Sequence, residues 1–449
     1  MPNLVLLASA DPAFNLLAAR WQMALTLGSH IILAVFGIGM PVLLLAAEWR
    51  YLRTGDEIWK ALAHRWSHVF AVLFAVGAIS GTVLSFELGL LWPEFMRQFG
   101  PVIGFAFAME GFAFFLEAIF VGIYLYGWNR LSKWTHWWCG VPIAISGAAS
   151  AWFVVTVSSW MSSPRGFRLV DGHAVDIDPL AALLNPSTGP QTVHMLVAAY
   201  IVAGFMVAAV YARSLLIDGK CEYSRRAMAL GLTMGAVMMP VQFVVGDWAA
   251  QSVAQVQPIK LAALEGQFQT EARAPLRIGG LPDAETRTTP YAIEIPGMLS
   301  WLGYRDVNAV VNGLDDFPPQ DIPPVATVHV AFQVMVGLGV YLLLLSIYAG
   351  WFVVRRRRLP DGRWFLTLLV LAGPLSIVAL EAGWVVTEVG RQPYLVHGVA
   401  RTAEMVTQAP YVGWLLLATV VIYGAIGAGT IAVLRLLGRR ELPENARGS

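Results

Sequence analysis

Several titratable side chains stand inside long apolar stretches of the sequence, where an ionisable group is costly unless it has a partner or a function. The residues of this kind are His30, His194, His329, Glu87, Glu110, Glu117, Glu381 and Glu388. Imidazole nitrogens and carboxylate oxygens can bind a metal, and carboxyl groups can also carry protons. These residue types indicate redox or proton-transfer chemistry inside a membrane. The other histidines are expected in loops or at interfaces: His64, His68, His136, His173 and His397.

Two of the acids are spaced for one face of a helix. Glu110 and Glu117 are seven residues apart, which corresponds to about two helical turns. At about 1.5 Å of rise per residue, Glu117 lies about 10 Å closer to the far side of the membrane than Glu110. Such a pair is a candidate proton relay, or a ligand above a relay. The alternative is a pair of protonated acids that hydrogen-bond neighbouring helices.

His194 and Met335 form a candidate pair of axial ligands. A histidine and a thioether at comparable depth on two helices suit a six-coordinate, low-spin heme, and methionine ligation raises its potential. The sequence contains 15 methionines, so Met335 alone would indicate packing. A lone membrane histidine is equally well explained as a polar contact between helices.

Membrane-spanning helices have to position these side chains. The 449 residues are 57% hydrophobic and only 13% charged, about half the charge of a soluble domain. The predicted fold is an all-α membrane protein of about nine transmembrane helices in helical bundles. The predicted spans are 18–46, 68–91, 101–127, 138–161, 191–212, 227–246, 326–354, 364–387 and 411–437.

The basic residues predict the orientation of these spans. Most Lys and Arg residues fall in the segments 50–65, 130–133, 213–226, 355–363 and 435–447. Basic loops stay in the cytoplasm, so we expect the N-terminus outside and the C-terminus inside. The start of the chain lacks a basic region and runs into the first span, so no separate signal peptide is expected. The net charge of +1 and the absence of a basic stripe argue against a nucleic-acid partner.

The spans divide the chain into four predicted parts. Transmembrane helices 1–6 occupy residues 1–246, an extracytoplasmic loop 247–325, helices 7–9 residues 326–437, and a cytoplasmic tail 438–449. Loops this long are usually functional or disordered. Within the loop, "PIKLAALEGQF" has helical spacing with Lys260 and Glu265 near its ends. It predicts either a functional helix or an ordinary amphipathic surface helix.

Six stretches of the sequence together resemble one family. They are "RWQMALTLGSH", "MEGFAFFLEAIFVGIYLYGW", "QTVHMLVAAYIVAG", "KLAALE", "VMVGLG" and "EAGWVVTEVGRQPY". In this order and spread over the whole chain, they resemble subunit I of the cytochrome bd quinol oxidases. The resemblance implies a bacterial inner-membrane enzyme that oxidises quinol at its outer face. It would reduce oxygen to water with cytoplasmic protons and generate proton motive force without pumping.

The resemblance also implies roles for the membrane residues. His194 and Met335 match the axial ligands of a low-spin heme b, and His30 matches the histidine ligand of a high-spin heme. Glu388 matches a carboxylate ligand associated with the other high-spin heme, and Glu110 a further acid at the high-spin pair. Which high-spin heme each residue holds is left open.

Five further residues match functional positions of the family. Glu117 matches an acid of the proton delivery path, and Lys260 and Glu265 match loop residues implicated in quinol binding. Arg391 and Gln392, in the signature string, are expected to interact with heme propionates. The expected partners are a heme-poor subunit II, small single-helix subunits, quinol, oxygen and the lipid bilayer.

Three departures from the common pattern narrow the resemblance. Tyr394 stands where many relatives have Trp, Gln333 where many have Arg, and the quinol loop is short. These features resemble the cyanide-insensitive branch of the family. The expected cofactors are therefore a low-spin heme b, a high-spin heme b and a third heme that is either heme d or heme b. Whether the substrate is ubiquinol or menaquinol is left open.

One rival class uses the same acids differently. An ion-coupled secondary transporter would employ Glu110 and Glu117 as coupling sites. It leaves the signature string and the long loop unexplained, and it predicts no heme absorption bands.

Overall fold

Long helices dominate the structure, a computed structural model that describes residues 11–219 and 221–439. Within these residues nine helices are long and apolar enough to cross a membrane, which confirms the predicted fold class. They are α2 (Pro12–Thr54), α3 (Glu57–Leu91), α4 (Pro93–Gly127), α5 (Lys133–Ser162), α7 (Thr188–Asp218), α8 (Glu222–Val256), α11 (Val325–Arg356), α12 (Arg363–Val389) and α14 (Val412–Arg439). The predicted tail from residue 440 onward and the basic residues Lys220, Arg440 and Arg447 lie outside the described residues.

Side-chain caps explain where several of these helices begin. Asp11, Asp56 and Ser132 each accept a hydrogen bond from a backbone N–H in the first turn of α2, α3 and α5. At the other end of α2, Gly55 adopts a left-handed conformation with φ of 70°, and its N–H donates to the Tyr51 carbonyl. That conformation favours glycine and ends the helix.

The helices are longer than the apolar stretches from which they were predicted. α8 continues to Val256, well past the predicted loop start at residue 247, and α2 begins at Pro12 rather than at residue 18. Hydropathy marks only the part of a helix that faces hydrocarbon. The backbone ladder continues through polar residues such as Asp247 and Gln251.

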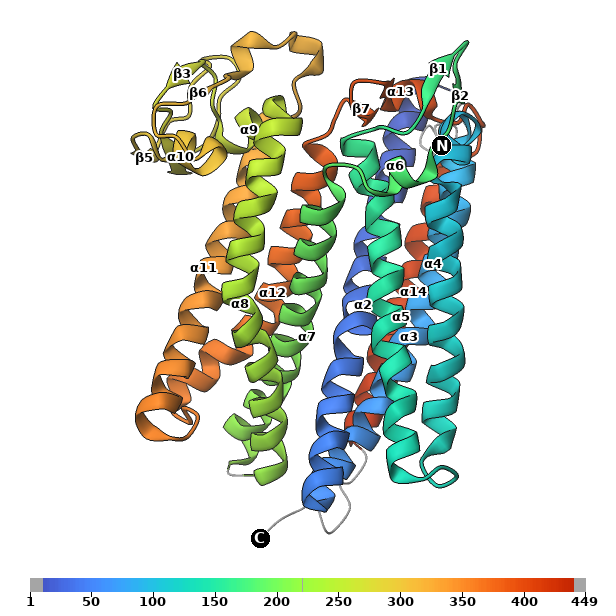
Figure 1. Ribbon diagram of the computed structural model, residues 1–449, viewed down its shortest axis with the longest axis vertical. Coiled ribbons are helices and arrows are strands. Elements are labelled where there is room, and N and C mark those ends of the chain that lie inside the picture. The colour runs from blue at the N-terminus through green and yellow to red at the C-terminus, as the bar shows by residue number, and fades with distance from the viewer. Residues whose placement is uncertain (1–10, 220, 440–449) are drawn as a thin grey trace, which may run out of the picture.

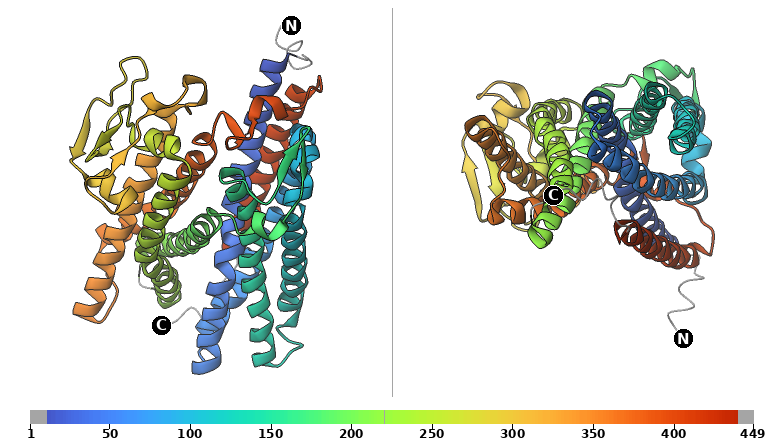
Figure 2. Two further views of the ribbon diagram at one scale, coloured as in Figure 1. Left: turned by 45° about the horizontal axis from the view of Figure 1, so that its top comes forward. Right: turned by 90° about the horizontal axis from the view of Figure 1, so that it is seen from below.

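The spanning helices form two groups (Figure 1). One contains α2, α3, α4, α5 and α14, and the other contains α7, α8, α11 and α12, as the end-on view of Figure 2 also shows. α7 joins the groups because it packs against α2 and α5 as well as against α8 and α12. A Cβ on Gly39 of α2 would lie 2.3 Å from the Cβ of Ala203 in α7, so this close crossing requires glycine.

The segment between α8 and α11 covers one end of the second group (Figure 1). Its elements are α9 (Pro258–Glu265), β3 (Glu271–Ala272), β4 (Leu276–Gly279), β5 (Ala292–Ile295), α10 (Met298–Tyr304), β6 (Val310–Val311) and two 3-10 turns, Leu314–Asp316 and Pro319–Asp321. β4 and β5 form an antiparallel hairpin with Leu276 opposite Ile295, and β3 pairs with β6. The backbone N–H of Gly279 donates to Gln333 Oε1 at 3.0 Å, which ties the hairpin to α11.

Two shorter connections lie at the same end of the molecule. β1 (Arg168–Val170), β2 (His173–Val175) and α6 (Pro179–Leu183) link α5 to α7, whereas β7 (Tyr394–Val396), β8 (Ala400–Arg401) and α13 (Thr402–Met405) link α12 to α14. α2 also begins at this end, and α14 finishes at the opposite end (Figure 1).

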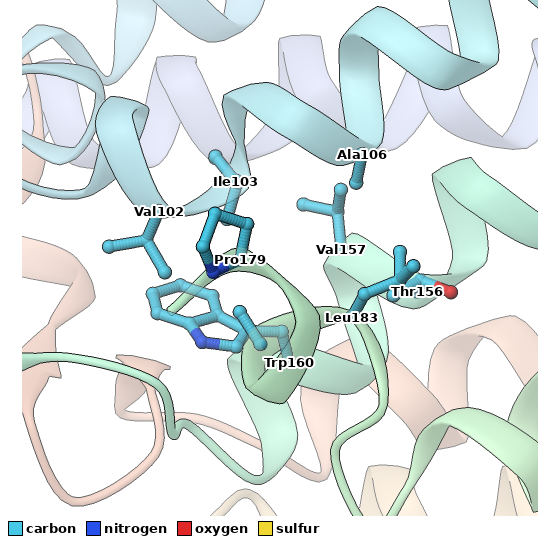
Figure 3. A pocket seen from close by; sticks show the side chains of 9 residues that line it. Val102, Ile103, Ala106, Thr156, Val157, Trp160, Pro179 and Leu183 are labelled. Carbon is cyan, nitrogen blue, oxygen red and sulfur yellow. The ribbon is translucent and has the colours of Figure 1, made fainter. Parts of the chain in front are cut away.

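A small apolar pocket lies where α4, α5 and α6 meet (Figure 3). Its lining residues are Val102, Ile103, Ala106, Thr156, Val157, Trp160, Pro179, Ala182 and Leu183. None of them is titratable, so this pocket belongs to the packing of the bundle.

Candidate functional site

His194 of α7 faces the polar side chain of Gln242 in α8. The Gln242 amide nitrogen lies 3.1 Å from His194 Nε2. His194 Nδ1 and Gln242 Oε1 are both buried and have no hydrogen-bond partner among the described residues. Buried polar atoms are nearly always satisfied, so this site has unused capacity for a bound group. The amide nitrogen can only donate, so the lone pair of a neutral His194 lies on Nε2, the nitrogen that would bind iron in place of Gln242.

Met335 of α11 lies against α12. Its Sδ is 3.0 Å from the position that a Cβ on Gly383 would occupy. A glycine at that position leaves room for the thioether. Likewise a Cβ on Gly246 would lie 3.5 Å from His194 Cε1. Both predicted ligands therefore belong to the second helix group, and each has a glycine beside it.

His30 of α2 has a defined tautomer. The Ser80 hydroxyl donates to the Gly77 carbonyl at 2.9 Å, which uses its only hydrogen. Ser80 Oγ must then accept from His30 Nδ1, 2.9 Å away. His30 Nε2 is left with its lone pair, which is the form that binds iron.

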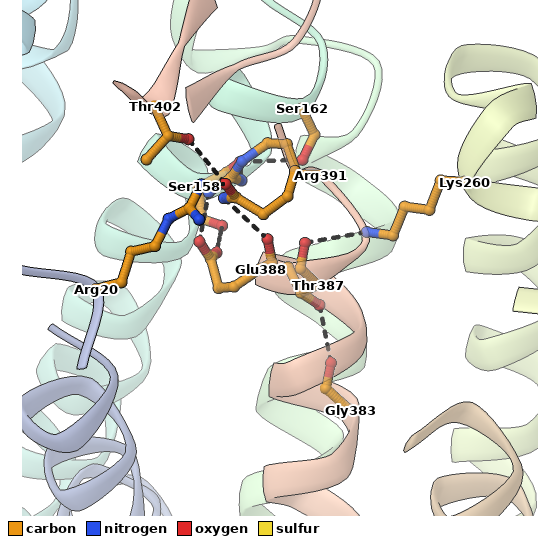
Figure 4. Close-up of polar contacts among 10 residues, drawn as sticks. Arg20, Ser158, Ser162, Lys260, Gly383, Thr387, Glu388, Arg391 and Thr402 are labelled. Carbon is orange, nitrogen blue, oxygen red and sulfur yellow. Dashed lines mark hydrogen bonds and ion pairs between the residues drawn. The ribbon is translucent and has the colours of Figure 1, made fainter. Parts of the chain in front are cut away.

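Glu388 and the buried Arg391 form an ion pair at the end of α12 (Figure 4). Arg391 Nη2 donates to Glu388 Oε2 at 2.5 Å, and the Ser158 hydroxyl of α5 donates to Glu388 Oε1 at 3.3 Å. The Arg391 side chain is 1% exposed, and its Nε has no hydrogen-bond partner within the described chain. The neighbouring Gln392 Oε1 accepts from Arg20 Nη2 at 2.8 Å and from the Thr402 hydroxyl at 2.9 Å.

Lys260 connects the loop to this ion pair. Its ammonium group donates to the backbone carbonyl of Thr387 at 3.3 Å, one residue before Glu388 (Figure 4). A Cβ on Gly390 would lie 3.0 Å from Lys260 Cε, so the lysine passes directly over the end of α12. Burial, together with the positive charge of Arg391, lowers the pKa of Lys260 to about 8.

Glu265, at the other end of α9, is buried as well. Its Oε2 has no hydrogen-bond partner among the described residues. Burial raises the pKa of Glu265 to about 8, although the backbone N–H and the charge of Arg277 act in the opposite direction. Every residue of α9 from Ile259 to Glu265 is buried. The helix was predicted correctly, but the alternative of an exposed surface helix is wrong.

Glu110 and Glu117 of α4 both face α5, as their spacing predicts. The Ser150 hydroxyl donates to Glu110 Oε1 at 3.2 Å. Glu117 is 5% exposed, and its Oε1 has no hydrogen-bond partner in the described part of the chain. A Cβ on Gly147 would lie 3.1 Å from this oxygen, so glycine makes space for the carboxyl group.

Some polar partners escaped the sequence reasoning. Ser80, Ser158 and Gln242 contact predicted ligands but were not singled out. Their signal is a polar residue inside an apolar span. His136, which the sequence placed in a loop or at an interface, and His329, near the start of the predicted span 326–354, are both buried in the structure. His329 lies 2.7 Å from the Leu264 carbonyl and 2.9 Å from the Gly279 carbonyl, so it holds the loop against α11.

In the described part of the chain, nine membrane-length helices with ligand-type side chains between them define a multi-pass membrane protein with a buried site. The chain belongs to the family of cytochrome bd terminal oxidase subunit I, whose model matches residues 18–442. Its relatives place it in the bacterial inner membrane.

Three relatives illustrate the similarity. A Bacillus subtilis (strain 168) protein, provisionally named as a cytochrome bd menaquinol oxidase subunit I, is 36% identical over 95% of this chain and 97% of its own length. Subunit 1 of the cytochrome bd-II ubiquinol oxidase of Escherichia coli (strain K12) is 28% identical over 86% of this chain and 88% of its own. The structure of the bd oxidase from Geobacillus thermodenitrificans matches with a TM-score of 0.90 at 37% identity, covering 96% of this chain and 99% of that one.

Proposed function

We propose that the chain is the heme-bearing subunit of a terminal oxidase that takes electrons from quinol and reduces oxygen to water. The contact between α9 and α12 carries the proposal. Lys260 of the expected quinol segment bonds the carbonyl of Thr387, next to the expected ligand Glu388. A residue assigned to quinol thus lies next to a residue assigned to the oxygen-reducing hemes.

His194 and Met335 would hold a low-spin heme b, since both lie in the second helix group beside glycines. His30 would bind one high-spin heme through Nε2, Glu388 would serve the other, and Glu110 would be a further acid at that pair. The third heme is heme d or heme b, and we assign the chain to the cyanide-insensitive branch. Bound hemes would supply the electron transfer and the reduction of oxygen, while the protein supplies ligands, charge and proton access.

Arg391 and Gln392 would position anionic groups of a heme. The Arg391 guanidinium is buried, and its Nε is left without a partner by the described residues. A planar cation with unused N–H groups suits a carboxylate such as a propionate.

Lys260 and Glu265 would act on quinol in the segment that follows α8. Oxidation of a quinol releases two electrons and two protons. The Glu265 carboxylate, with a pKa of about 8, can take up such a proton around that pH and release it to water. The Lys260 cation can orient the quinol oxygen before the proton leaves.

The membrane orientation follows from the basic loops, with the N-terminus and the α9 segment outside and the C-terminus in the cytoplasm. Quinol protons are then released outside, and the protons for water come from the cytoplasm, where Glu117 is the inner acid of the pair. This arrangement builds proton motive force without a pump.

A second subunit and small single-helix subunits would complete the enzyme. Large apolar side chains on α4 are exposed in this chain, with Phe112 at 70% and Phe115 at 67%. Such surfaces need lipid or partner helices to cover them.

Absorption spectra of the purified complex test the proposal. Wild type should show heme bands in its reduced-minus-oxidised spectrum and consume oxygen with quinol. His194→Ala and Met335→Leu should each abolish or shift the low-spin bands, because each removes an axial ligand. A complex without heme bands would favour the transporter class, and unchanged low-spin bands in both variants would sink these ligand assignments.

A further inference from the structure

A second cluster of buried titratable groups lies at the opposite end of α2, α4 and α5. Glu48, Tyr124 and His136 come from these three helices, and each is at most 2% exposed. The Tyr124 hydroxyl donates to Glu48 Oε2 at 2.6 Å, and His136 Nδ1 lies 2.7 Å from Glu48 Oε1. The site described above uses none of them.

The contacts of His136 determine how many protons the cluster holds. His136 Nε2 lies 2.8 Å from the backbone carbonyl of Tyr124, which can only accept, so Nε2 carries a hydrogen. One proton then lies between Nδ1 and Glu48 Oε1, on either the imidazole or the carboxyl group. Glu48 and His136 therefore share a single exchangeable proton in a buried place.

Tyr124 lies on the same face of α4 as Glu110 and Glu117. It follows Glu117 by seven residues, as Glu117 follows Glu110, so all three lie on one face of the helix. The facing helix α5 places small residues against this face. A Cβ on Gly147 would lie 3.1 Å from the Glu117 carboxyl group, and one on Gly140 would lie 3.3 Å from the Tyr124 ring.

Trp128 lies between the cluster and the exposed His64. The indole of Trp128 lies against the His136 ring with centroids 4.3 Å apart, and the His64 ring lies 5.2 Å beyond it. His64 is exposed. Trp128 Nε1 is buried without a hydrogen-bond partner among the described residues, so the indole separates the cluster from solvent without being tied in place.

We propose that the Glu48–His136–Tyr124 cluster is the inner proton-loading site that supplies Glu117. This inference rests on the proposed function, because the protons are those consumed when oxygen is reduced. His136 in this cluster has the geometry of a proton donor, because the backbone carbonyl of Tyr124 fixes its tautomer.

The transfer balances at each atom. Tyr124 passes its hydroxyl proton toward Glu117. The Glu48 carboxyl group, which has taken the shared proton from His136 Nδ1 on Oε1, then turns to return that proton to the Tyr124 oxygen. The pair is then reprotonated from the His64 side. Val121, between Glu117 and Tyr124 on this face of α4, is apolar and cannot carry a proton, so the step from Tyr124 to Glu117 requires a bridging water molecule.

The competing explanation is a static tie that joins α2, α4 and α5. A buried carboxylate bonded to a tyrosine and a histidine would stabilise the fold without any proton movement. The two explanations differ in the rate of proton uptake, which a static tie does not set.

The test uses the purified complex with all subunits and hemes. The fully reduced enzyme is mixed with oxygen in weak buffer with a pH-indicator dye, and proton uptake is timed. Glu48→Gln should slow the uptake about tenfold or more, the range expected when a positioned proton carrier is lost. Heme bands and heme reduction by quinol should remain. The infrared difference spectrum of wild type should contain a carboxyl band that Glu48→Gln removes.

Two tyrosine variants provide the matched comparison. Tyr124→Phe removes only a hydroxyl group and should also slow proton uptake, even if Glu48→Gln assembles poorly. Tyr211→Phe removes a hydroxyl group that accepts from Trp66 Nε1 at 2.8 Å, outside the cluster, and should leave uptake unchanged.

Wild-type uptake in both Glu48→Gln and Tyr124→Phe, with only a lower melting temperature, would overturn the inference and support the static tie. A wild-type complex without heme or quinol oxidation would instead overturn the proposed function.

Discussion

Two carboxyl groups near opposite ends of the bundle each pair with a nitrogen-containing side chain. The two partners differ in how readily they give up a proton. Glu388 is paired with Arg391, whose guanidinium keeps its proton at any physiological pH. Glu48 is paired with His136, and an imidazole can release and regain a proton. The first pair is a permanent charge arrangement suited to hold a ligand. The second pair can move a proton.

The surroundings of the two pairs agree with this difference. Glu388 is 26% exposed, and Lys260 brings a second cation to its helix end. Glu48 and His136 are each 2% exposed, and His136 packs against the rings of Tyr124 and Trp128 at the end of α4. The loop contacts the pair proposed to bind a heme, whereas the helix bundle encloses the pair proposed to transfer protons. The pair with a fixed charge and the pair with an exchangeable proton thus lie near opposite ends of the bundle.

The largest effect is expected where the permanent pair loses its anion. Glu388→Ala leaves the Arg391 guanidinium buried and unpaired, at a cost of about 3–5 kcal/mol. It also removes a proposed ligand of a high-spin heme. Oxygen consumption should stop and the high-spin bands should be lost or shifted, as measured by an oxygen electrode and absorption spectra. Ser158→Ala, which removes only the 3.3 Å bond to Glu388, is the matched mild variant. Normal turnover in Glu388→Ala would contradict its assignment.

A smaller effect is expected when Arg391 is replaced by a histidine, whose side chain can lose its charge. Arg391→His converts the outer pair into the inner kind, and turnover should fall about 100-fold because the fixed charge and the planar fork are both lost. Arg391→Lys keeps the charge and should lose about tenfold. Steady-state oxygen consumption measures both variants. If histidine and lysine serve equally well, permanence of the charge is not what the outer site requires.

The loop residues should give a pH signature. The pKa values of Glu265 and Lys260 are both shifted to about 8. Above pH 8, Glu265 is ionised and can accept a quinol proton, but Lys260 loses its ammonium charge, so kcat/KM for quinol should peak near pH 8. Glu265→Gln should remove the rising limb and keep the fall at high pH. Heme reduction by an artificial donor should be unchanged, and an unaltered pH profile would speak against the role of Glu265.

The smallest effect is expected in the path between the two ends. Gly147→Ala places a Cβ 3.1 Å from Glu117 Oε1, which the carboxyl group must avoid by a few tenths of an ångström. Turnover should slow by about two- to fivefold with all hemes present, since small misplacements of a proton carrier slow transfer. Gly122→Ala is the control, because its Cβ meets nothing within 4 Å. Equal rates in the two variants would show that space at Glu117 does not limit turnover.

Sequence reasoning predicted the helices because each needs about 20 apolar residues, a signal that is local in the chain. It also found Glu110 and Glu117, since the seven-residue spacing is visible in the sequence. Extending that spacing once more would have reached Tyr124. Single titratable residues in apolar stretches were likewise recognisable without a partner in view.

Contacts between distant helices were not predictable in the same way. Glu48 meets Tyr124 and His136 across 76 and 88 residues of chain, and hydropathy assigned His136 to an interface. The burial of α9 was missed because a short amphipathic helix looks alike whether it faces water or protein. Lys260 of α9 donates a hydrogen bond to the Thr387 carbonyl in α12, and no local sequence pattern predicts that contact.

The contact between His30 and Ser80 has a consequence for how the enzyme is assembled. Ser80 and the Gly77 carbonyl hold the imidazole in one tautomer by contacts within the polypeptide alone. His30 therefore presents an open Nε2 lone pair without a bound cofactor, and the heme iron proposed to bind there would not require a proton to be removed first. Under the proposed assignment of His30 as a heme ligand, insertion of the membrane helices and delivery of heme do not have to be coupled.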